Sequence, residues 1–342
     1  MSQAVRITKE GRAGRICLAR PEALNALTSD MVSDLHKALN RFNDDNSVDL
    51  IAMEGEGRAF CAGGDLVSIY GAALRGDVDA GRQFWADEYR FNLAIGASAK
   101  PVVTFLHGYV MGGGIGLGCH AALRIADPDT VFAVSQPRIG LAPDAGSSFL
   151  LSLAPGRMGE YLGCTGKRFS AADACYLGFA DRIIPRKDWG TVLGDLCTTG
   201  RIDRVSVGMQ ADSGLAEHVA DVDTHFTGET LGDIWRSLTQ DDGPFAKDAR
   251  DMLTSVSPLA AAAAVEMMHR LGDGKPLATA LELEYRFAHR AITEGDVAEG
   301  IRALLVDRDN APKWRHTGPD AVPAIAVSRM LQPLGNEGWF PG

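Results

Sequence analysis

Short apolar runs alternate with amphipathic stretches along the first half of the chain. The apolar runs at 14–18, 50–53 and 101–106 have the length and composition of buried β-strands. Between the first two, Thr28 or Ser29 is a suitable N-cap for a helix. A helix that begins there places apolar residues on one side at three- and four-residue steps, namely Met31, Leu35, Ala38, Leu39 and Phe42. Strands that alternate with helices in this way predict an α/β fold.

The last third of the chain has a helical pattern. Pro258 follows Ser257 at the first position of an alanine-rich segment that runs toward Gly272, and a second amphipathic segment covers 277–292. The preceding stretch is less periodic and richer in Asp, Gly and Thr. We therefore predict a core at 1–200, an insert or connecting region at 201–256, and a helical region at 257–342.

Charge and cysteine usage narrow the class of protein. The 342 residues carry a formal net charge of −10, which disfavours binding to nucleic acid or to an anionic membrane surface. The six cysteines form no C-x-x-C pair and no zinc-like cluster with histidine, so we predict reduced thiols and no metal site. The N-terminus has no apolar leader and no stretch is apolar enough to span a membrane, so the sequence predicts a cytoplasmic protein.

Two glycine-rich stretches, 58–65 and 107–118, are the candidates for chemistry. Glycine lets the backbone approach a ligand, and two N–H groups aimed at one oxygen make an oxyanion hole. The same glycines could instead only allow close packing of a strand against a helix. Neither stretch matches a G-x-G-x-x-G or G-x-x-x-x-G-K-[ST] pattern, so no nucleotide-binding loop is indicated.

The motifs along the chain resemble the crotonase (enoyl-CoA hydratase/isomerase) superfamily. The resemblance rests on Arg20-Pro21 with Asn25-Ala26-Leu27, on Ala59-Phe60-Cys61-Ala62-Gly63-Gly64-Asp65, and on His107-Gly108 leading into Met111-Gly112-Gly113-Gly114. Within the superfamily, the segments at 132–146, 281–286, 299–307 and 311–314 are similar to those of 3-hydroxyisobutyryl-CoA hydrolases, which act in valine catabolism. The resemblance covers nearly the whole chain.

This resemblance implies a fold and a set of site residues. The core should be a spiral of β-β-α repeats, and the backbone N–H groups of Gly64 and Gly113 should hold the thioester oxygen. Oxyanion-hole donors of this kind are worth roughly 3 to 4 kcal/mol each. The family's substrate-binding positions fall on Ala59, Ala62, Glu88 and Gly112. Coenzyme A is then part of the substrate rather than a cofactor, and a homo-oligomer, a trimer or hexamer, is implied.

The acid–base residues depart from the hydratase pattern. Hydratases carry two glutamates where this chain has Gly116 and Gln136, so the resemblance argues against hydration. The hydrolase branch has a small residue, a glutamate and then an aspartate eight positions later, and Asp144 keeps that aspartate. Gln136 can orient a water but cannot accept a proton. Asp144 is expected to act as general base or nucleophile, although Pro-Asp-Ala-Gly is also ordinary turn chemistry.

Three functions follow from these residues. The first is hydrolysis of a short-chain acyl-CoA, the second is another crotonase reaction (an isomerase, hydratase or lyase), and the third is acyl-CoA binding with little activity.

Some of the residues have structural interpretations. Glu88 has a competing interpretation as a solvent-facing helix residue. His107, Cys61 and the pair Met267-Met268 are expected to be structural.

Overall fold

The apolar runs of the first half form one mixed sheet. The computed structural model describes residues 3–272 and 274–338 and divides them into two compact units. The first unit contains the residues up to Gly64, Asp87–Ala133 and Phe169–Gly214. Its large sheet has an antiparallel pair at one edge and is otherwise parallel. The strands, in spatial order, are β1 (Val5–Glu10), β2 (Ala13–Leu18), β3 (Leu50–Gly55), β4 (Val102–Leu106), β6 (Leu123–Ala126) and β9 (Arg182–Ile183).

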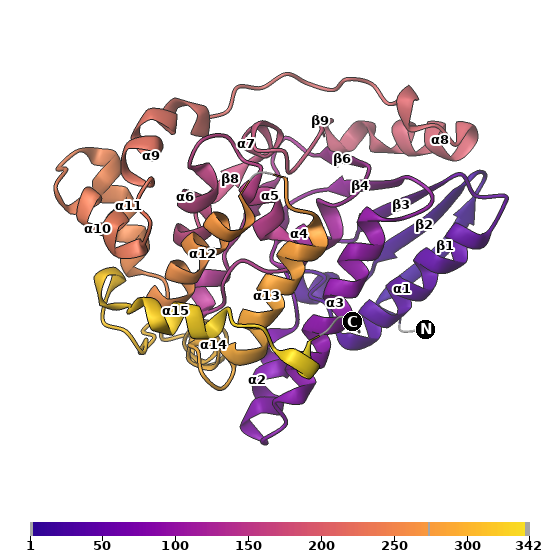
Figure 1. The fold of residues 1–342 in the computed structure, drawn as a ribbon. Coiled ribbons are helices and arrows are strands. Elements are labelled where there is room, and N and C mark those ends of the chain that lie inside the picture. The colour runs from indigo at the N-terminus through magenta and orange to yellow at the C-terminus, as the bar shows by residue number, and fades with distance from the viewer. Residues whose placement is uncertain (1–2, 273, 339–342) are drawn as a thin grey trace. The chain divides into compact units, whose positions relative to one another are not determined.

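Helices α1 (Ser29–Asp44) and α8 (Trp189–Thr199) cover opposite faces of this sheet (Figure 1). Alternate strand residues, among them Leu50, Ala52 and Val103, pack with Trp189 and Leu196 of α8. Side chains alternate between the faces of a strand, so the neighbouring positions face α1. A Cβ at Gly14 would lie only 2.4 Å from the Phe42 ring of α1, which explains why glycine stands there.

The N-terminus of α1 follows the sequence prediction. The side chain of Thr28 accepts a hydrogen bond from the backbone N–H of Met31 at 3.3 Å, which makes Thr28 the N-cap. All five residues of the predicted apolar stripe are buried. Lys100 donates to the carbonyl oxygens of Phe42 and Asp45 at the other end of α1. The Lys100 side chain is half-buried and supports this helix end.

A small second sheet supports the predicted spiral. It contains β5 (Tyr109–Met111), β7 (Val131–Ala133) and β8 (Arg168–Ser170). The successive pairs β4–β5 and β6–β7 each give one strand to the large sheet and one to the small sheet, with parallel pairing in both. The short helix α4 (Gly113–Gly118) lies between the two pairs in the chain. Stacked β-β-α repeats are therefore confirmed.

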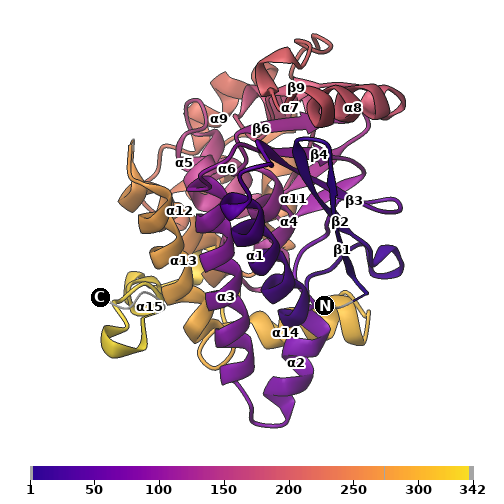
Figure 2. The ribbon, with the colours of Figure 1, turned by 90° about the vertical axis from the view of Figure 1, so that its right-hand side faces the viewer.

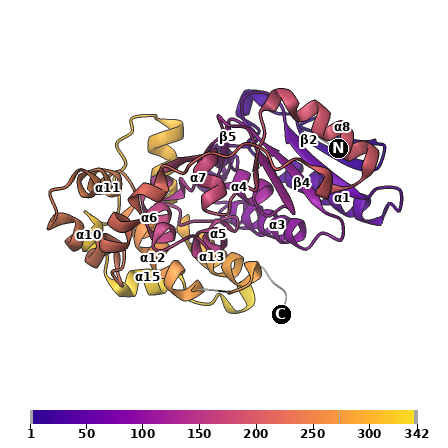
Figure 3. The ribbon, with the colours of Figure 1, turned by 90° about the horizontal axis from the view of Figure 1, so that it is seen from above.

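The second unit is helical and is built around α12 (Pro258–Leu271). It contains Asp65–Ala86, Val134–Arg168 and the chain from Leu215 onward. Ser257 caps α12, Pro258 is its first residue, and nearly every side chain of the helix is buried. The alanines at 260–264 let neighbouring helices approach closely, and α6, α10 and α11 gather around α12 in Figure 3. The other helices placed wholly in this unit are α2 (Leu66–Leu74), α5 (Ser147–Ser152), α6 (Met158–Thr165), α9 (Val219–His225), α10 (Leu231–Thr239), α11 (Pro244–Thr254), α13 (Leu277–Ala291), α14 (Val297–Ile301) and α15 (Ala324–Met330).

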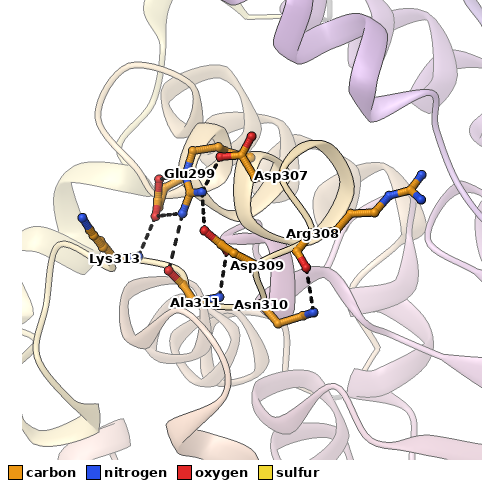
Figure 4. A network of polar contacts seen from close by, with 8 residues as sticks. Glu299, Asp307, Arg308, Asp309, Asn310, Ala311 and Lys313 are labelled. Atoms are coloured by element: carbon orange, nitrogen blue, oxygen red, sulfur yellow. Dashed lines mark hydrogen bonds and ion pairs between the residues drawn. The ribbon is translucent and has the colours of Figure 1, made fainter.

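Arg302 organises the chain after α14. Helix α14 lies beside α2 (Figure 2) and continues into a π-helical turn at Arg302–Val306. The Arg302 guanidinium pairs with the carboxylates of Glu299, Asp307 and Asp309 at 2.6 to 2.8 Å (Figure 4). Glu299 also accepts from the backbone N–H of Lys313 at 2.7 Å. These contacts hold the chain at 311–314, the last of the segments that are similar to 3-hydroxyisobutyryl-CoA hydrolases.

Two further features concern the helices and the thiols. Within 3–272 and 274–338, no helix is long and apolar enough to cross a membrane. All six cysteines are free thiols, four of them buried.

The remaining α-helices of the described residues are α3 (Asp79–Gly96) and α7 (Ala171–Tyr176). The residues of α3 from Asp87 onward belong to the first unit.

Candidate active site

Asn25 holds the first glycine loop in place. Its backbone is left-handed, with φ 57°, and its side chain is fully buried. The Nδ2 atom lies 2.9 to 3.1 Å from the carbonyl oxygens of Glu56, Ala59 and Phe60, and Oδ1 accepts from the N–H of Arg20 at 2.8 Å. The motif containing Asn25 was noted in the sequence, but its role as the clamp of the loop depends on contacts more than 30 residues away.

The two glycine loops lie against one another in the first unit. Cys61 pairs with Val110 in a parallel bridge. The Cys61 N–H donates to the carbonyl of Tyr109 at 3.2 Å, and the Cys61 carbonyl accepts from Met111 at 3.1 Å. The stretches at 58–65 and 107–118 are thus joined by backbone hydrogen bonds immediately before their glycines.

The N–H of Gly64 points away from Leu27, the residue with which Gly64 forms an isolated parallel bridge. The carbonyl of Gly63 accepts a hydrogen bond from the N–H of Leu27 at 2.8 Å. The peptide between Gly63 and Gly64 is trans, so its N–H points opposite to that carbonyl. The donor of Gly64 is therefore turned away from Leu27.

The N–H of Gly113 points out of the start of α4. Gly113 is the first residue of this helix, so its N–H has no carbonyl partner within the helix. The carbonyl of Gly112 accepts from Ile115 at 2.8 Å, which turns the Gly113 N–H in the opposite direction. Gly112 itself has φ 52° and ψ −125°, a conformation suited to glycine. A Cβ on Gly63 would lie 3.8 Å from the Gly113 nitrogen, so this donor borders the first loop.

Helix α4 presents bare backbone to two polar side chains of α3. A Cβ on Gly113 would lie 2.1 Å from Oε1 of Glu88, and a Cβ on Gly116 would lie 2.5 Å from Nδ2 of Asn92. Glu88 is 2% exposed and Asn92 is 0% exposed. The interpretation of Glu88 as a solvent-facing residue is therefore wrong, because this carboxyl packs directly on the proposed oxyanion donor.

Other glycines of α4 serve packing alone. A Cβ on Gly114 would lie 2.1 Å from the carbonyl oxygen of Cys61, and one on Gly118 would lie 2.6 Å from Leu106. The packing interpretation of the glycine-rich stretch therefore applies at Gly114 and Gly118, and the oxyanion role of Gly113 stays a prediction. Of the predicted coenzyme A contacts in the first loop, Ala59 is fully buried and Ala62 is half-buried.

Gln136 and Asp144 form a buried pair in the second unit. Gln136 begins a 3-10 turn at Gln136–Ile139, and its Nε2 donates to Oδ1 of Asp144 at 2.6 Å. The two residues are 4% and 6% exposed. Burial raises the pKa of Asp144 to about 6, while the hydrogen bond from Gln136 opposes that rise. Among the described residues, Oε1 of Gln136 has no hydrogen-bond partner.

The backbone after Asp144 is unusual. Ala145 has φ 55° and Gly146 has φ 78°, and α5 begins directly afterwards. The carbonyl of Asp144 accepts from the N–H of Ser147 at 2.9 Å. A left-handed alanine is strained, so other contacts must hold this loop in its conformation.

Glu284 of α13 supplies those contacts, and this role was not predicted from the sequence. Its carboxyl oxygens accept from the N–H of Gly146 at 2.7 Å, from the N–H of Ser148 at 2.9 Å, and from the Ser148 hydroxyl. Burial raises the pKa of Glu284 to about 8, the three donors oppose this rise, and the nearby charge of Asp144 adds to it. The role of Glu284 could have been suspected from the sequence, because this glutamate stands on the apolar side of the predicted helix at 277–292.

Two residues expected to be structural are confirmed as such. The ring Nε2 of His107 lies 3.1 Å from the carbonyl of Gly57, and burial lowers the pKa of His107 to about 4. Cys61 is fully buried, and burial raises the pKa of its thiol to about 12. Neither group is suited to acid–base or nucleophilic chemistry near pH 7.

Comparison with known families decides the classification. A family model described as enoyl-CoA hydratase/isomerase matches residues 13–331. The chain belongs to the enoyl-CoA hydratase/isomerase family. Membership of this family supports a reaction on an acyl-CoA.

Relatives with curated descriptions cover almost the full length of this family member. It is 31% identical to the mitochondrial 3-hydroxyisobutyryl-CoA hydrolase of Homo sapiens, over 98% of this chain and 90% of the human protein. It is 34% identical to a probable 3-hydroxyisobutyryl-CoA hydrolase of Arabidopsis thaliana, over 92% of this chain and 87% of the plant protein. The human relative is named mitochondrial, so the predicted cytoplasmic location gains no support.

Solved structures carry different reaction names. The fold matches a crystal structure described as an enoyl-CoA hydratase from Rhodobacter sphaeroides 2.4.1, with a TM-score of 0.95 and 43% identity over 99% of this chain and all of the other. It also matches one described as a carnitinyl-CoA dehydratase from Mycobacterium thermoresistibile, with a TM-score of 0.91 and 36% identity over 97% of both chains. These two solved structures share the crotonase fold, and their names give two different reactions.

Proposed function

We propose that the protein hydrolyses a short-chain acyl-CoA thioester of the 3-hydroxyisobutyryl-CoA type. The observation that carries this proposal is the buried carboxyl of Asp144, whose pKa of about 6 suits a base at neutral pH. Its partner Gln136 donates a hydrogen bond and leaves the proton-accepting role to Asp144 alone. The names of the human and plant relatives support the same reaction.

In the proposed reaction, Asp144 removes a proton from a water while the water oxygen bonds to the thioester carbon. The N–H groups of Gly64 and Gly113 stabilise the oxyanion that forms. The carbon–sulfur bond then breaks, and the proton returns from Asp144 to the departing thiolate of coenzyme A. Gln136 orients the water, and Glu88 with Ala59, Ala62 and Gly112 contacts the substrate. The alternative role of Asp144 is direct attack on the thioester carbon, with water then releasing the acyl group.

Two observations disfavour hydration. Position 116 lacks a carboxylate, and the amide of Asn92 fills the space beside its Cα. Position 136 carries an amide in place of the second glutamate. A hydratase that relies on two glutamates would lack both groups, each ordinarily worth about 10²- to 10⁴-fold in rate.

The names of the solved structures favour a second candidate within the same family. The carnitinyl-CoA dehydratase description motivates a lyase or isomerase in which Asp144 moves a proton on an enolate. Gln136 motivates a third candidate, an acyl-CoA-binding protein with little turnover.

Product analysis separates these candidates. Purified protein is incubated with 3-hydroxyisobutyryl-CoA and a panel of short acyl-CoAs and enoyl-CoAs, and free thiol is measured beside chromatography of the CoA esters. Hydrolysis releases free thiol, whereas an isomerase or lyase converts one CoA ester into another. Tight binding without either product supports the third candidate. Assembly as a trimer or hexamer and a cytoplasmic location stay predictions.

A further inference from the structure

Asn92 carries a buried amide whose two polar atoms meet no hydrogen-bond partner among the residues that the structure describes. It lies one helical turn after Glu88 on α3 and is 0% exposed. Among the described residues, neither its Nδ2 nor its Oδ1 has a hydrogen-bond partner. Folded proteins rarely leave both ends of a buried amide unsatisfied, so a group outside the chain is expected to complete it.

Asn92 lies beside α4, the helix that begins with the proposed oxyanion donor Gly113. We therefore expect the group that completes the Asn92 amide to belong to the acyl part of the substrate. Glu88 packs on Gly113 and Asn92 packs on Gly116, so successive turns of α3 lie along successive turns of α4. The N–H of Gly113, the proposed oxyanion donor, begins that same helix. A thioester oxygen bound by Gly113 would therefore bring its acyl group to the part of α4 that Asn92 faces.

The chemistry of the amide defines what it can bind. A neutral hydroxyl can donate to Oδ1 and accept from Nδ2, and so can complete both atoms. An acyl carboxylate can only accept, so it would leave Oδ1 of Asn92 without a donor. The Asn92 amide, with one donor and one acceptor to satisfy, thus selects an uncharged hydroxyl over both a carboxylate and a plain alkyl group.

We propose that Asn92 is a specificity-determining residue that binds the hydroxyl of a hydroxylated short-chain acyl-CoA. This inference rests on the proposed function, because it requires the thioester to be held at Gly113. The same hydrogen-bonding chemistry could come from an ordered water, and the experiment below distinguishes the two sources.

The test compares two substrates that differ only by the hydroxyl, 3-hydroxyisobutyryl-CoA and isobutyryl-CoA, in wild type and Asn92→Leu. Wild type should prefer the hydroxylated ester by about 10- to 100-fold in kcat/KM, because the deoxy ester leaves the amide unsatisfied. Asn92→Leu should reduce this preference to within about threefold, mainly by lowering kcat/KM for the hydroxylated ester. An unchanged preference in the variant would mean that Asn92 holds a water or only packs, and would overturn the proposal.

A matched control comes from the other end of α4. The hydroxyl of Thr104 is also fully buried, but it donates to the carbonyl of Gly118 at 2.8 Å. Thr104→Val should affect both esters equally, because its hydroxyl already has a partner. Thermal unfolding of each variant verifies folding, and Asn92→Ala is the second variant if leucine does not fit.

Failure of the proposed function is distinguishable from failure of this inference. If no thiol is released from either ester, equilibrium binding of the two esters is measured by calorimetry with wild type and Asn92→Leu. Tighter binding of the hydroxylated ester that is lost in the variant would support the subsite without hydrolysis. Equal binding of both esters by wild type would overturn it.

Discussion

The Nε2 of Gln136 lies 2.6 Å from Oδ1 of Asp144, and both side chains are buried. A neutral donor at this distance fixes the carboxyl without supplying the charge that would fully stabilise its ionised form. Burial therefore dominates, and the pKa of Asp144 rises to about 6. At pH 7 the carboxyl is mostly ionised but is a stronger base than an exposed aspartate.

The pH dependence of turnover should report this group. A general base must be deprotonated, so kcat/KM for thioester hydrolysis should fall as the pH drops through about 6. Initial rates between pH 4.5 and 8, in buffers of constant ionic strength, measure the profile. A rate that stays constant from pH 7 to pH 5 would rule out Asp144 as the base.

Asp144→Asn should separate activity from stability. We expect thiol release to fall by about 10²- to 10⁴-fold, because asparagine cannot accept the proton. The folded pKa of Asp144 lies above its unfolded value of 3.8, so wild type loses stability as the pH rises from about 4 through about 6. Above pH 6 the variant should therefore be more stable by on the order of 3 kcal/mol.

Urea unfolding at pH 4 and pH 7.5 tests the stability difference. Asp248→Asn is the matched control, because this exposed aspartate pairs with Lys167 at 3.1 Å on the surface. It should change stability by less than about 1 kcal/mol. Equal stability of wild type and Asp144→Asn at both pH values would contradict the assigned ionisation.

Gln136→Glu would replace the amide that donates to Asp144 with a second carboxyl beside it. Like charges in a buried site oppose each other's ionisation, so the acidic limb of the rate profile should move to higher pH. If wild type binds acyl-CoA without turnover, this substitution should instead create thiol release. A variant with wild-type rates and an unshifted profile would show that position 136 does not influence the chemistry.

Glu284→Ala should loosen the Asp144 loop. The substitution leaves the N–H groups of Gly146 and Ser148 without their acceptor, so we expect a loss of about 2 to 4 kcal/mol in unfolding free energy and a lower kcat. Glu282→Gln, on the exposed side of the same helix, should change stability by less than about 1 kcal/mol. Similar stability losses in both variants would mean that Glu284 does not support the loop.

Gly113→Ala should disturb the proposed oxyanion donor. Its Cβ would lie 2.1 Å from the carboxyl of Glu88, so either that side chain or the start of α4 must move. We expect kcat/KM to fall by about 10²-fold or more. Gly194→Ala is the control, since beyond its own stretch of α8 no described residue lies within 4 Å of its Cβ position, and it should stabilise the protein by about 0.5 to 1 kcal/mol. Unimpaired turnover in Gly113→Ala would count against an oxyanion role.

The sequence alone determined the elements and the glycine loops. The cap at Thr28, the stripe on α1 and the proline start of α12 are local features, because they depend on residues within a few turns of one another. Family motifs extended this local information to the fold and to the pair of glycines at 64 and 113. Asp144 and Gln136 were also identified this way, since their spacing of eight residues is visible in the chain.

Tertiary structure decided which groups act on these residues. Glu284 reaches the Asp144 loop across more than 130 residues, and Asn92 meets Gly116 because α3 packs against a helix without side chains on that face. The raised pKa of Asp144 likewise depends on burial by distant segments. Hydrogen-bond satisfaction and desolvation are properties of the three-dimensional surroundings, and no local pattern in the chain specifies them.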